Sequence, residues 1–225
     1  MKIISFSLWG NNPKYTVGAI KNAELAKEIY PGWVCRFYCA SDVPNPIVFQ
    51  LEDMDNVEMV FMKKPGDWTS MFWRFEPAGE ENVEVMISRD TDSRLNHREE
   101  EAVAEWLASD FGFHIMRDHP WHGYPVLGGM WGAKRTTLAN IKHMMKSFDQ
   151  SDKYGTDYEF FASISDSISG NVMVHDEFFS NRASLIDYQG CAPLPFPTAR
   201  VGKDFVGKPF NADDSICLSE ADKVI

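Results

Sequence analysis

Apolar and polar residues are arranged in two different ways along this chain. Short apolar runs of strand length predict β-strands at Lys2–Leu8, Val34–Ala40, Val57–Met62, Val83–Ser88, Phe113–Arg117 and Val172–His175. Longer stretches, with apolar residues three or four positions apart, predict helices at Thr16–Tyr30, Asn96–Ser109, Thr136–Phe148 and Thr156–Ser167. Strands that alternate with helices in this way predict an α/β fold with a mixed, mostly parallel sheet and helices on both faces.

The ends of two predicted helices carry capping signals. Asn96 is followed three residues later by Glu99, and Thr156 by Glu159, which is the spacing of a capping box. Beyond Gln189 the chain is rich in proline, at positions 193, 195, 197 and 209. We therefore expect an irregular final segment that wraps over the sheet.

The chain has 225 residues, enough for one sizeable domain and few for two. Its formal net charge of −11 argues against a nucleic-acid groove, which needs a basic stripe, and against docking on an anionic membrane. No apolar run is long enough to span a membrane. The apolar start reads as a first strand, not as a signal peptide, so we expect a cytoplasmic protein without a membrane span.

Two carboxylates, Asp90 and Asp92, directly follow the apolar run Val85–Ser88. Strand ends are where α/β sheets bind ligands. Carboxylates one residue apart can both reach a hard divalent cation such as Mg²⁺ or Mn²⁺, and a cation so held can take the diphosphate of an activated sugar. The alternative is a strand end that makes only ion pairs, since Arg89 and Arg94 flank the two acids.

A second polar cluster, His114–Gly123, occupies the end of another predicted strand. Asp118 can accept hydrogen bonds from sugar hydroxyls, and the ring of Trp121 can stack on a pyranose face. Zinc binding by His119 and His122 is an alternative, although the sequence offers no further ligands at a zinc-like spacing.

Four other features each have a functional and a structural interpretation. Gly128-Gly129 lets a backbone approach a ligand closely, or simply forms a tight turn. His175, at the end of an apolar segment, is a third metal ligand or a structural histidine. Asp157, in the first turn of a predicted helix, is a general base or a residue favoured by the helix dipole. Arg74 lies in an aromatic stretch that is otherwise expected to be core, and a cation there suits a phosphate or carboxylate partner.

Several of these motifs together resemble a GT-A glycosyltransferase family that includes the N-terminal domain of a large chlorella-virus protein. The resemblance covers nearly the whole chain and rests on Ser5–Gly10, Met71–Phe75, Ser88–Arg94 with Arg98-Glu99, His114–Pro120, Gly128–Gly132 and Phe205–Gly207. It implies a single, Rossmann-like GT-A domain. The nucleotide-binding half would cover about residues 1–110 and the acceptor half about residues 111–225.

The resemblance also implies roles for individual residues. Asp90 and Asp92, with His175 as a third ligand, would hold Mn²⁺ or Mg²⁺ against the diphosphate of a sugar donor. The donor-binding residues implied by the resemblance, together with neighbours of the acidic motif, are Ser7, Leu8, Trp9, Tyr15, Arg74, Arg89, Asp90, Asp118, Gly128 and Gly129.

The expected reaction is transfer of a hexosyl or deoxyhexosyl group from a nucleoside diphosphate sugar, with UDP favoured over GDP, to a glycan or another small hydroxyl acceptor. The bound cation would offset negative charge on the leaving diphosphate. An inverting enzyme needs a general base, for which Asp157 and Asp118 are the two candidates, whereas a retaining enzyme does not.

Two other functions are compatible with the sequence. An Asp-x-Asp phosphatase also uses Mg²⁺ after a strand, but its motif normally follows the first strand. A non-catalytic protein that binds sugar nucleotides or glycans on the same fold is the other alternative. It arises because related transferases often carry Asp-Gln where this chain has Asp157-Tyr158.

Overall fold

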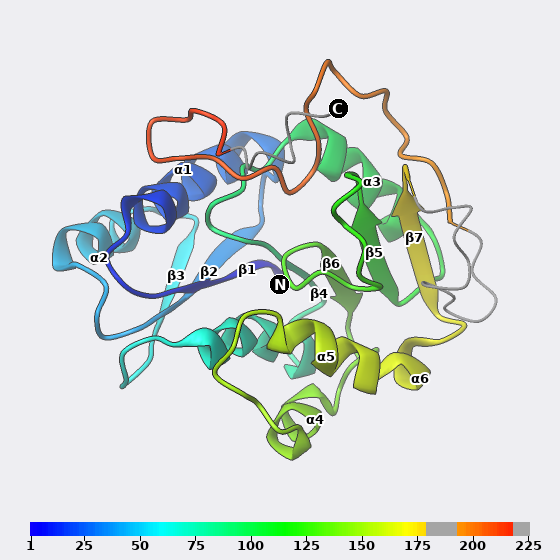
Figure 1. Ribbon diagram of the computed structural model, residues 1–225, viewed down its shortest axis with the longest axis horizontal. Helices are drawn as coiled ribbons and strands as arrows, with labels where there is room; N and C mark the ends of the chain where they lie inside the picture. The colour runs from blue at the N-terminus through cyan, green and yellow to red at the C-terminus, as the bar shows by residue number, and fades with distance from the viewer. Residues whose placement is uncertain (179–192, 218–225) are drawn as a thin grey trace.

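The computed structural model describes residues 1–178 and 193–217, and within them seven strands form one sheet in the order β3-β2-β1-β4-β6-β5-β7 (Figure 1). The strands are β1 (Lys2–Leu8), β2 (Val34–Cys39), β3 (Val57–Phe61), β4 (Val85–Ser88), β5 (Phe113–Arg117), β6 (Trp131–Lys134) and β7 (Val172–Asp176). Only β6 among them runs antiparallel to its two neighbours, β4 and β5. The predicted α/β class with a mixed, mostly parallel sheet is confirmed.

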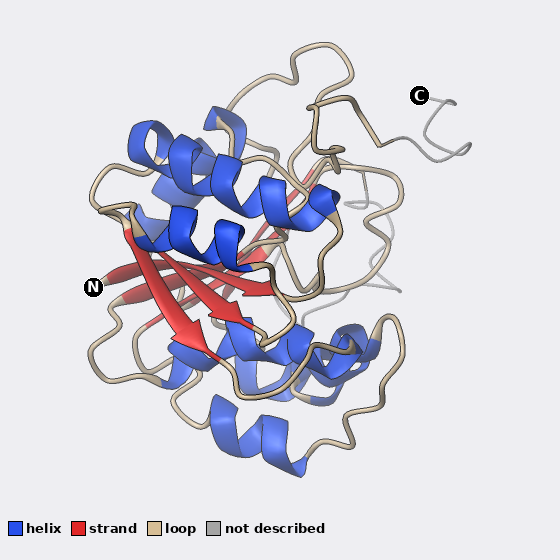
Figure 2. Cartoon of the chain, turned by 90° about the vertical axis from the view of Figure 1, so that its left-hand side faces the viewer, coloured by secondary structure: helices blue, strands red, loops and turns tan. Residues whose placement is uncertain are grey.

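Helices cover both faces of this sheet (Figure 2). One face packs against α1 (Pro13–Ile29), α2 (Asn45–Glu52) and α3 (His97–Ala108). The other packs against the 3₁₀ helix η1 (Trp68–Gly79), α4 (Ile141–Ser147), α5 (Thr156–Ser163) and α6 (Ser165–Ile168). No helix in the described ranges is long and apolar enough to cross a membrane.

The first strand shows how the sequence divides its side chains between these two layers. Ile4, Phe6 and Leu8 face the core beneath α1, while Ile3 faces the core beneath η1. Alternate residues of a strand point to opposite faces, so a strand covered on both sides must be apolar almost throughout. The nearly continuous apolar runs of the sequence are the consequence, and each predicted strand is present with small shifts at its ends.

The helices were predicted less well than the strands. The segment predicted as helical from Thr136 to Phe148 is helical only as α4, since residues 135–140 form turns and Thr136 has a left-handed backbone (φ 72°). The predicted capping box at the start of α5 is wrong. Gly155 is the N-cap there, with φ 83°, and Glu159 pairs with Lys153 at 2.7 Å.

The predicted cap of α3 is half correct. The Oδ1 of Asn96 accepts a hydrogen bond from the backbone N–H of Glu99 at 3.0 Å, as expected. The carboxylate of Glu99 does not return to Asn96 but pairs with Arg89.

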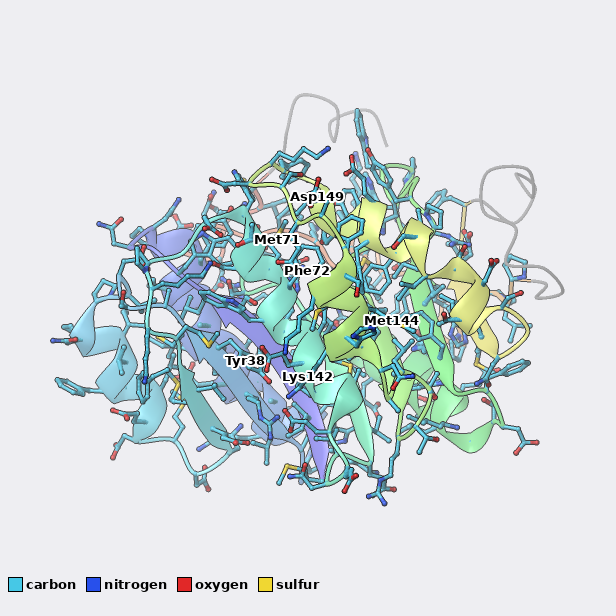
Figure 3. All side chains as sticks on the ribbon, turned by 90° about the horizontal axis from the view of Figure 1, so that it is seen from below. Tyr38, Met71, Phe72, Lys142, Met144 and Asp149 are labelled. Atoms are coloured by element: carbon cyan, nitrogen blue, oxygen red, sulfur yellow. The ribbon has the colours of Figure 1, made fainter. Side chains whose placement is uncertain are left out.

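Three elements were missed by the sequence pattern, namely α2, η1 and β6. The helix η1 contains four aromatic residues and packs against α4 (Figure 3). The ring of Phe72 lies 6.1 Å from that of Phe148, the residue that follows α4. The buried residues of η1 fit the expectation that this aromatic stretch is core. Strand β6 is only four residues long and contains glycine, which weakens any strand signal.

The missed strand β6 decides the position of the paired glycines. Its first residue, Trp131, is the register partner of Ser88, the last residue of β4. Because the two strands are antiparallel, the chain that enters β6 lies beside the chain that leaves β4. Gly128-Gly129 is thereby brought next to Asp90.

The described part of the final segment, residues 193–217, is irregular as expected and crosses the edge of the sheet at which the parallel strands end (Figure 1). Leu194 forms a bridge with His175 on β7. The backbone N–H of Phe210 donates to the carbonyl oxygen of Asp92 at 2.8 Å, and Asp214 pairs with Arg94 at 3.1 Å. Residues 189–192, where this segment was expected to begin, lie outside the described residues.

Candidate donor-binding and catalytic site

A cleft of about 520 Å³ opens at the carboxyl ends of β1 and β4. Nine of the predicted catalytic, donor-binding and metal-binding residues line it, namely Ser7, Trp9, Tyr15, Arg74, Asp90, Asp92, Gly128, Gly129 and Asp157. Trp121 and Tyr158 line it as well. The cleft lies where α/β sheets generally bind ligands.

Arg74 connects the acidic motif to the first turn of α5. Its guanidinium, on a side chain 5% exposed, contacts Asp90 directly and lies 3.5 Å from Oδ2 of Asp157. Its backbone N–H donates to Ser7 Oγ, whose hydroxyl in turn donates to the carbonyl oxygen of Ser70. Burial alone would lower the pKa of Arg74, but the charges of Asp90 and Asp157 outweigh this effect and raise it. A fixed cation therefore lies between two carboxylates.

Asp92 is held by a cation from a different element. The Nζ of Lys14, near the start of α1, lies 2.7 Å from its Oδ2. Burial and the neighbouring charge of Asp90 raise the pKa of Asp92, whereas the contact with Lys14 opposes that rise. Burial would lower the pKa of Lys14, but its contact with Asp92 raises it. Two crowded carboxylates of this kind favour a nearby positive charge.

The two glycines let the backbone pass close to these carboxylates. A Cβ on Gly129 would lie 2.0 Å from Oδ2 of Asp90, and a Cβ on Gly128 would lie 2.0 Å from Oδ2 of Asp157. The carbonyl oxygen of Gly128 accepts a hydrogen bond from Ser88 Oγ at 2.6 Å, which fixes the loop to the end of β4. Any larger residue would displace the acids.

Asp157 is a buried carboxylate that faces the cleft. It lies in the first turn of α5, with a side chain 4% exposed. Burial raises the pKa of its carboxyl, the guanidinium of Arg74 opposes this rise, and the charge of Asp90 adds to it. A raised pKa makes a carboxylate a better proton acceptor near neutral pH.

Four predicted site residues do not line the cleft. Leu8 belongs to the core beneath α1. Arg89 points away from the acidic motif and forms a fully buried ion pair with Glu99 at 3.0 Å, to which Tyr30 also donates. Its expected part in donor binding is therefore not supported by the geometry. Asp118 and His175 are the other two.

Asp118 anchors the final segment of the chain. Its carboxylate, 0% exposed, pairs with Arg98 and Arg200, each at 2.8 Å, and accepts the backbone N–H of Val206 at 2.9 Å. With both oxygens engaged and no exposure to the cleft, it is poorly placed to accept a proton from a substrate. Its position at the end of β5 was predicted correctly, but its surroundings depend on residues far along the chain.

His175 lies at 0% exposure within β7, distant from the acidic motif in the order of the sheet. Its Nδ1 is 2.8 Å from Nε2 of His114, and its Nε2 is 3.3 Å from Glu105. The structure thus does not bring it to Asp90 and Asp92. In the described ranges no group of three His, Cys, Asp or Glu residues is arranged to hold a metal, and that includes the zinc alternative at His119 and His122.

Several residues of the cleft were not predicted as donor-binding or catalytic residues, among them Lys14, Trp68 and Tyr154. His119 and His122, which also line it, were considered only as zinc ligands, and Phe205 and Gly207 only as part of the resemblance. Lys14 follows Pro13 at the start of a helix next to the first strand, and this position is a signal that could have suggested it. Trp68, at the start of η1, and Tyr154, in the turn before α5, reach the cleft through tertiary packing, which the sequence pattern does not show.

No family model matches the chain, and no curated protein matches it in sequence. Among solved structures, it is similar to a glycosyltransferase involved in glycosylation of the major capsid of PBCV-1, with a TM-score of 0.53 at 15% identity over 78% of this chain and 81% of the other. It is also similar to the galactosyltransferase LgtC solved with donor and acceptor sugar analogs (TM-score 0.53, 11% identity, 84% and 80% covered).

A third similar structure is the mannosyltransferase PcManGT from Pyrobaculum calidifontis in complex with GDP-Man and Mn²⁺ (TM-score 0.52, 13% identity, 78% and 54% covered). These neighbours are GT-A glycosyltransferases, and the chain has their fold. The resemblance inferred from the sequence motifs is thereby confirmed at the level of the fold.

Proposed function

We propose that this protein is a metal-dependent glycosyltransferase that moves a sugar from a nucleoside diphosphate sugar, with UDP favoured over GDP, to a hydroxyl acceptor. The observation that carries the proposal is the pair Asp90 and Asp92 at the edge of the cleft, held by Arg74 and Lys14. The PcManGT structure holds GDP-Man and Mn²⁺, and a similar glucosyl-3-phosphoglycerate synthase from Mycobacterium tuberculosis holds Mn²⁺ and UDP (TM-score 0.51, 9% identity).

The donor set of this site fits Mg²⁺ or Mn²⁺. Asp90 and Asp92 supply hard oxygen atoms, and the side chain of Asp90 is 47% exposed towards solvent. Mg²⁺ is usually bound by one or two carboxylates, with substrate phosphates and water completing the shell. A site with two carboxylates therefore suits a cation that arrives together with a diphosphate. When bound, the cation would stabilise charge on the leaving diphosphate.

Other residues of the cleft would bind the phosphates, bind the nucleoside and accept the acceptor's proton. Lys14 and Arg74 are the cations closest to the acidic pair and can bind phosphate oxygens when the carboxylates turn to a metal. Trp9 and Tyr15, at the end of β1 and the start of α1, supply rings for the nucleoside. Asp157, with its raised pKa, accepts the proton of the acceptor hydroxyl in an inverting reaction.

Isothermal titration calorimetry with UDP and with GDP, in the presence and absence of Mn²⁺, tests this function. We expect nucleotide binding that depends on Mn²⁺ in the wild type and is lost in Asp92→Ala. A matched control is Asp55→Ala, because Asp53-Met54-Asp55 is a second Asp-x-Asp copy whose Asp55 side chain is 85% exposed. Unchanged binding in Asp92→Ala would overturn the proposal.

Donor turnover separates the remaining functions. Slow, Mn²⁺-dependent hydrolysis of a UDP-sugar supports a transferase, whereas donor binding without any turnover supports a sugar-nucleotide-binding protein. Hydrolysis of a simple phosphomonoester without nucleotide binding would support a phosphatase. The cytoplasmic location expected from the sequence stays a prediction.

A further inference from the structure

Exposed tryptophan and tyrosine side chains gather at one place on the described surface. Those that are more than a third exposed are Tyr15 (37%), Trp68 (41%), Trp121 (62%), Tyr124 (50%) and Tyr154 (72%). Four of them line the cleft, and Tyr124 stacks on Tyr158, which also lines it. Large exposed rings concentrated at one cleft indicate a binding surface.

Four of these aromatic residues form a continuous strip, which we define as Trp68, Tyr154, Tyr158 and Tyr124. Successive ring centroids are 5.5, 6.3 and 4.2 Å apart. The strip is built from three segments, namely the start of η1 with Trp68, residues 154–158, and the loop between β5 and β6 with Tyr124. The first two are joined by the backbone N–H of Trp68, which donates to Oδ1 of Asp152 at 3.0 Å. The strip therefore offers a preformed row of rings longer than a single sugar.

The strip has the chemistry of a carbohydrate surface. Tyrosine and tryptophan each combine an apolar ring face with a polar tip, which suits a ligand that has both C–H faces and hydroxyl groups. The nearest cation on the same segment, Lys153, is already paired with Glu159 at 2.7 Å. The chain as a whole carries a formal charge of −11. A neutral chain of sugars fits such a surface better than a nucleic acid or another anionic polymer.

The strip also lies on the correct side of the proposed donor. Tyr158 directly follows Asp157, the proposed base, while Trp9 touches the opposite end of the strip at Trp68, with centroids 6.5 Å apart. A ligand bound along the strip would therefore pass Asp157, the proposed base, with Trp68 and the proposed nucleoside ring Trp9 at one end of the strip and Tyr124 at the other.

We propose that this aromatic strip is the acceptor subsite and that the acceptor is a neutral oligosaccharide of several sugar units. The inference rests on the proposed function and adds the substrate class to it. It also gives a role to Tyr158, whose ring stacks on Tyr124 and meets Tyr154 edge to face.

A glycan array of neutral and acidic oligosaccharides, probed with the full chain in the presence of UDP and Mn²⁺, tests the proposal. We expect binding to neutral glycans of three or more sugars. Tyr154→Ala and Trp68→Ala should each weaken binding of the best glycan about tenfold, as removal of a central aromatic contact typically does. Phe49→Ala is the matched control, because Phe49 is 65% exposed on α2, outside the residues that line the cleft.

The two hypotheses fail in different ways. If the wild type showed no Mn²⁺-dependent UDP binding, the proposed function itself would be contradicted. Intact UDP binding with no neutral glycan bound, with a preference for acidic glycans, or with glycan affinity unchanged in Tyr154→Ala and Trp68→Ala would overturn the acceptor subsite alone. A wild-type dimer that sedimentation detects and that Tyr154→Ala dissociates would also overturn the acceptor subsite, since the strip would then be an interface between two copies.

Discussion

The Nζ of Lys14 lies 2.7 Å from Oδ2 of Asp92, so a side chain from the first helix occupies an oxygen that the proposed metal site requires. A cation and Lys14 cannot both have full use of that oxygen. The contact joins α1 to the end of β4. The sequence pattern does not predict that these two elements lie close together. Lys14 therefore supplies the positive charge beside Asp92 when neither metal nor nucleotide is bound.

Replacing Lys14 with methionine should change metal and nucleotide binding in opposite directions. Without its competitor, Mn²⁺ alone should bind about fivefold more tightly, while UDP with Mn²⁺ should bind more weakly because a phosphate partner is lost. Titration of Mn²⁺ followed by electron paramagnetic resonance measures the first effect. Lys21→Met, on the same helix but paired with Asp214, should change neither. If Lys14→Met weakened the binding of Mn²⁺ and of UDP equally, this role of Lys14 would be contradicted.

Asp157→Asn should separate binding from proton transfer. If Asp157 is the general base, kcat should fall about 10²–10⁴-fold while UDP affinity stays within a few-fold of the wild type. Asp166→Asn, on the exposed side of α6, serves as the control and should leave kcat unchanged. A small drop in kcat for Asp157→Asn would instead point to a retaining mechanism, which needs no such base.

Gly129→Ala should displace the acidic motif by a steric clash. The added Cβ would lie 2.0 Å from Oδ2 of Asp90, so the carboxylate must move. We expect loss of Mn²⁺-linked nucleotide binding, measured by calorimetry, in a protein that is still folded by circular dichroism. Gly123→Ala in the same loop meets no atom within 4 Å and should bind nucleotide normally. Normal binding by Gly129→Ala would show that the position of Asp90 is unimportant.

Asp118→Ala should lower the free energy of unfolding, because Asp118 has a structural role. The carboxylate neutralises Arg98 and Arg200, and removing one partner of a buried ion pair typically costs about 3–5 kcal/mol. The free energy of unfolding, from urea denaturation, should therefore fall substantially. A stable variant with a large loss in kcat would restore Asp118 as a catalytic base.

The pair His114 and His175 should make the protein less stable in acid. Burial, then the neighbouring His175 and Arg89, lower the pKa of His114 well below its ordinary value, and burial lowers the pKa of His175 despite Glu105. The folded state thus binds fewer protons than the unfolded state below about pH 6.5, so stability present above that pH is lost as the pH falls.

Urea denaturation between pH 7.5 and pH 5 measures this loss, with a slope of up to about 1.4 kcal/mol per pH unit for each proton. His114→Phe preserves the stacking on Trp106, whose ring lies 5.1 Å away, and should flatten the slope. His143→Phe, on an exposed position of α4, should leave it unchanged. An equally steep slope in His114→Phe would assign the acid sensitivity to other groups.

The sequence by itself determined six of the seven described strands, the fold class and the acidic motif. Strands buried on both faces must be apolar almost throughout, and Asp90 stands out because it breaks such a run. Both signals are local, because each depends only on residues that are consecutive in the chain. The GT-A resemblance added an expected donor-binding role for the first strand end and for Arg74. That role stays a prediction, and Ser7, Trp9 and Arg74 line the cleft.

Only the tertiary structure decided which of the remaining polar residues meet. Asp118 and His175 also end or interrupt apolar runs, yet one is neutralised by Arg98 and Arg200 and the other is paired with His114. Lys14, Trp68 and Tyr158 reach the cleft because α1, η1 and α5 pack on the faces of the sheet with their first turns at the cleft. Such partners are separated by tens of residues in the chain, and their approach depends on strand order and register, which periodicity does not encode. The short antiparallel β6 is the clearest case, because its register with Ser88 alone places Gly129 against Asp90.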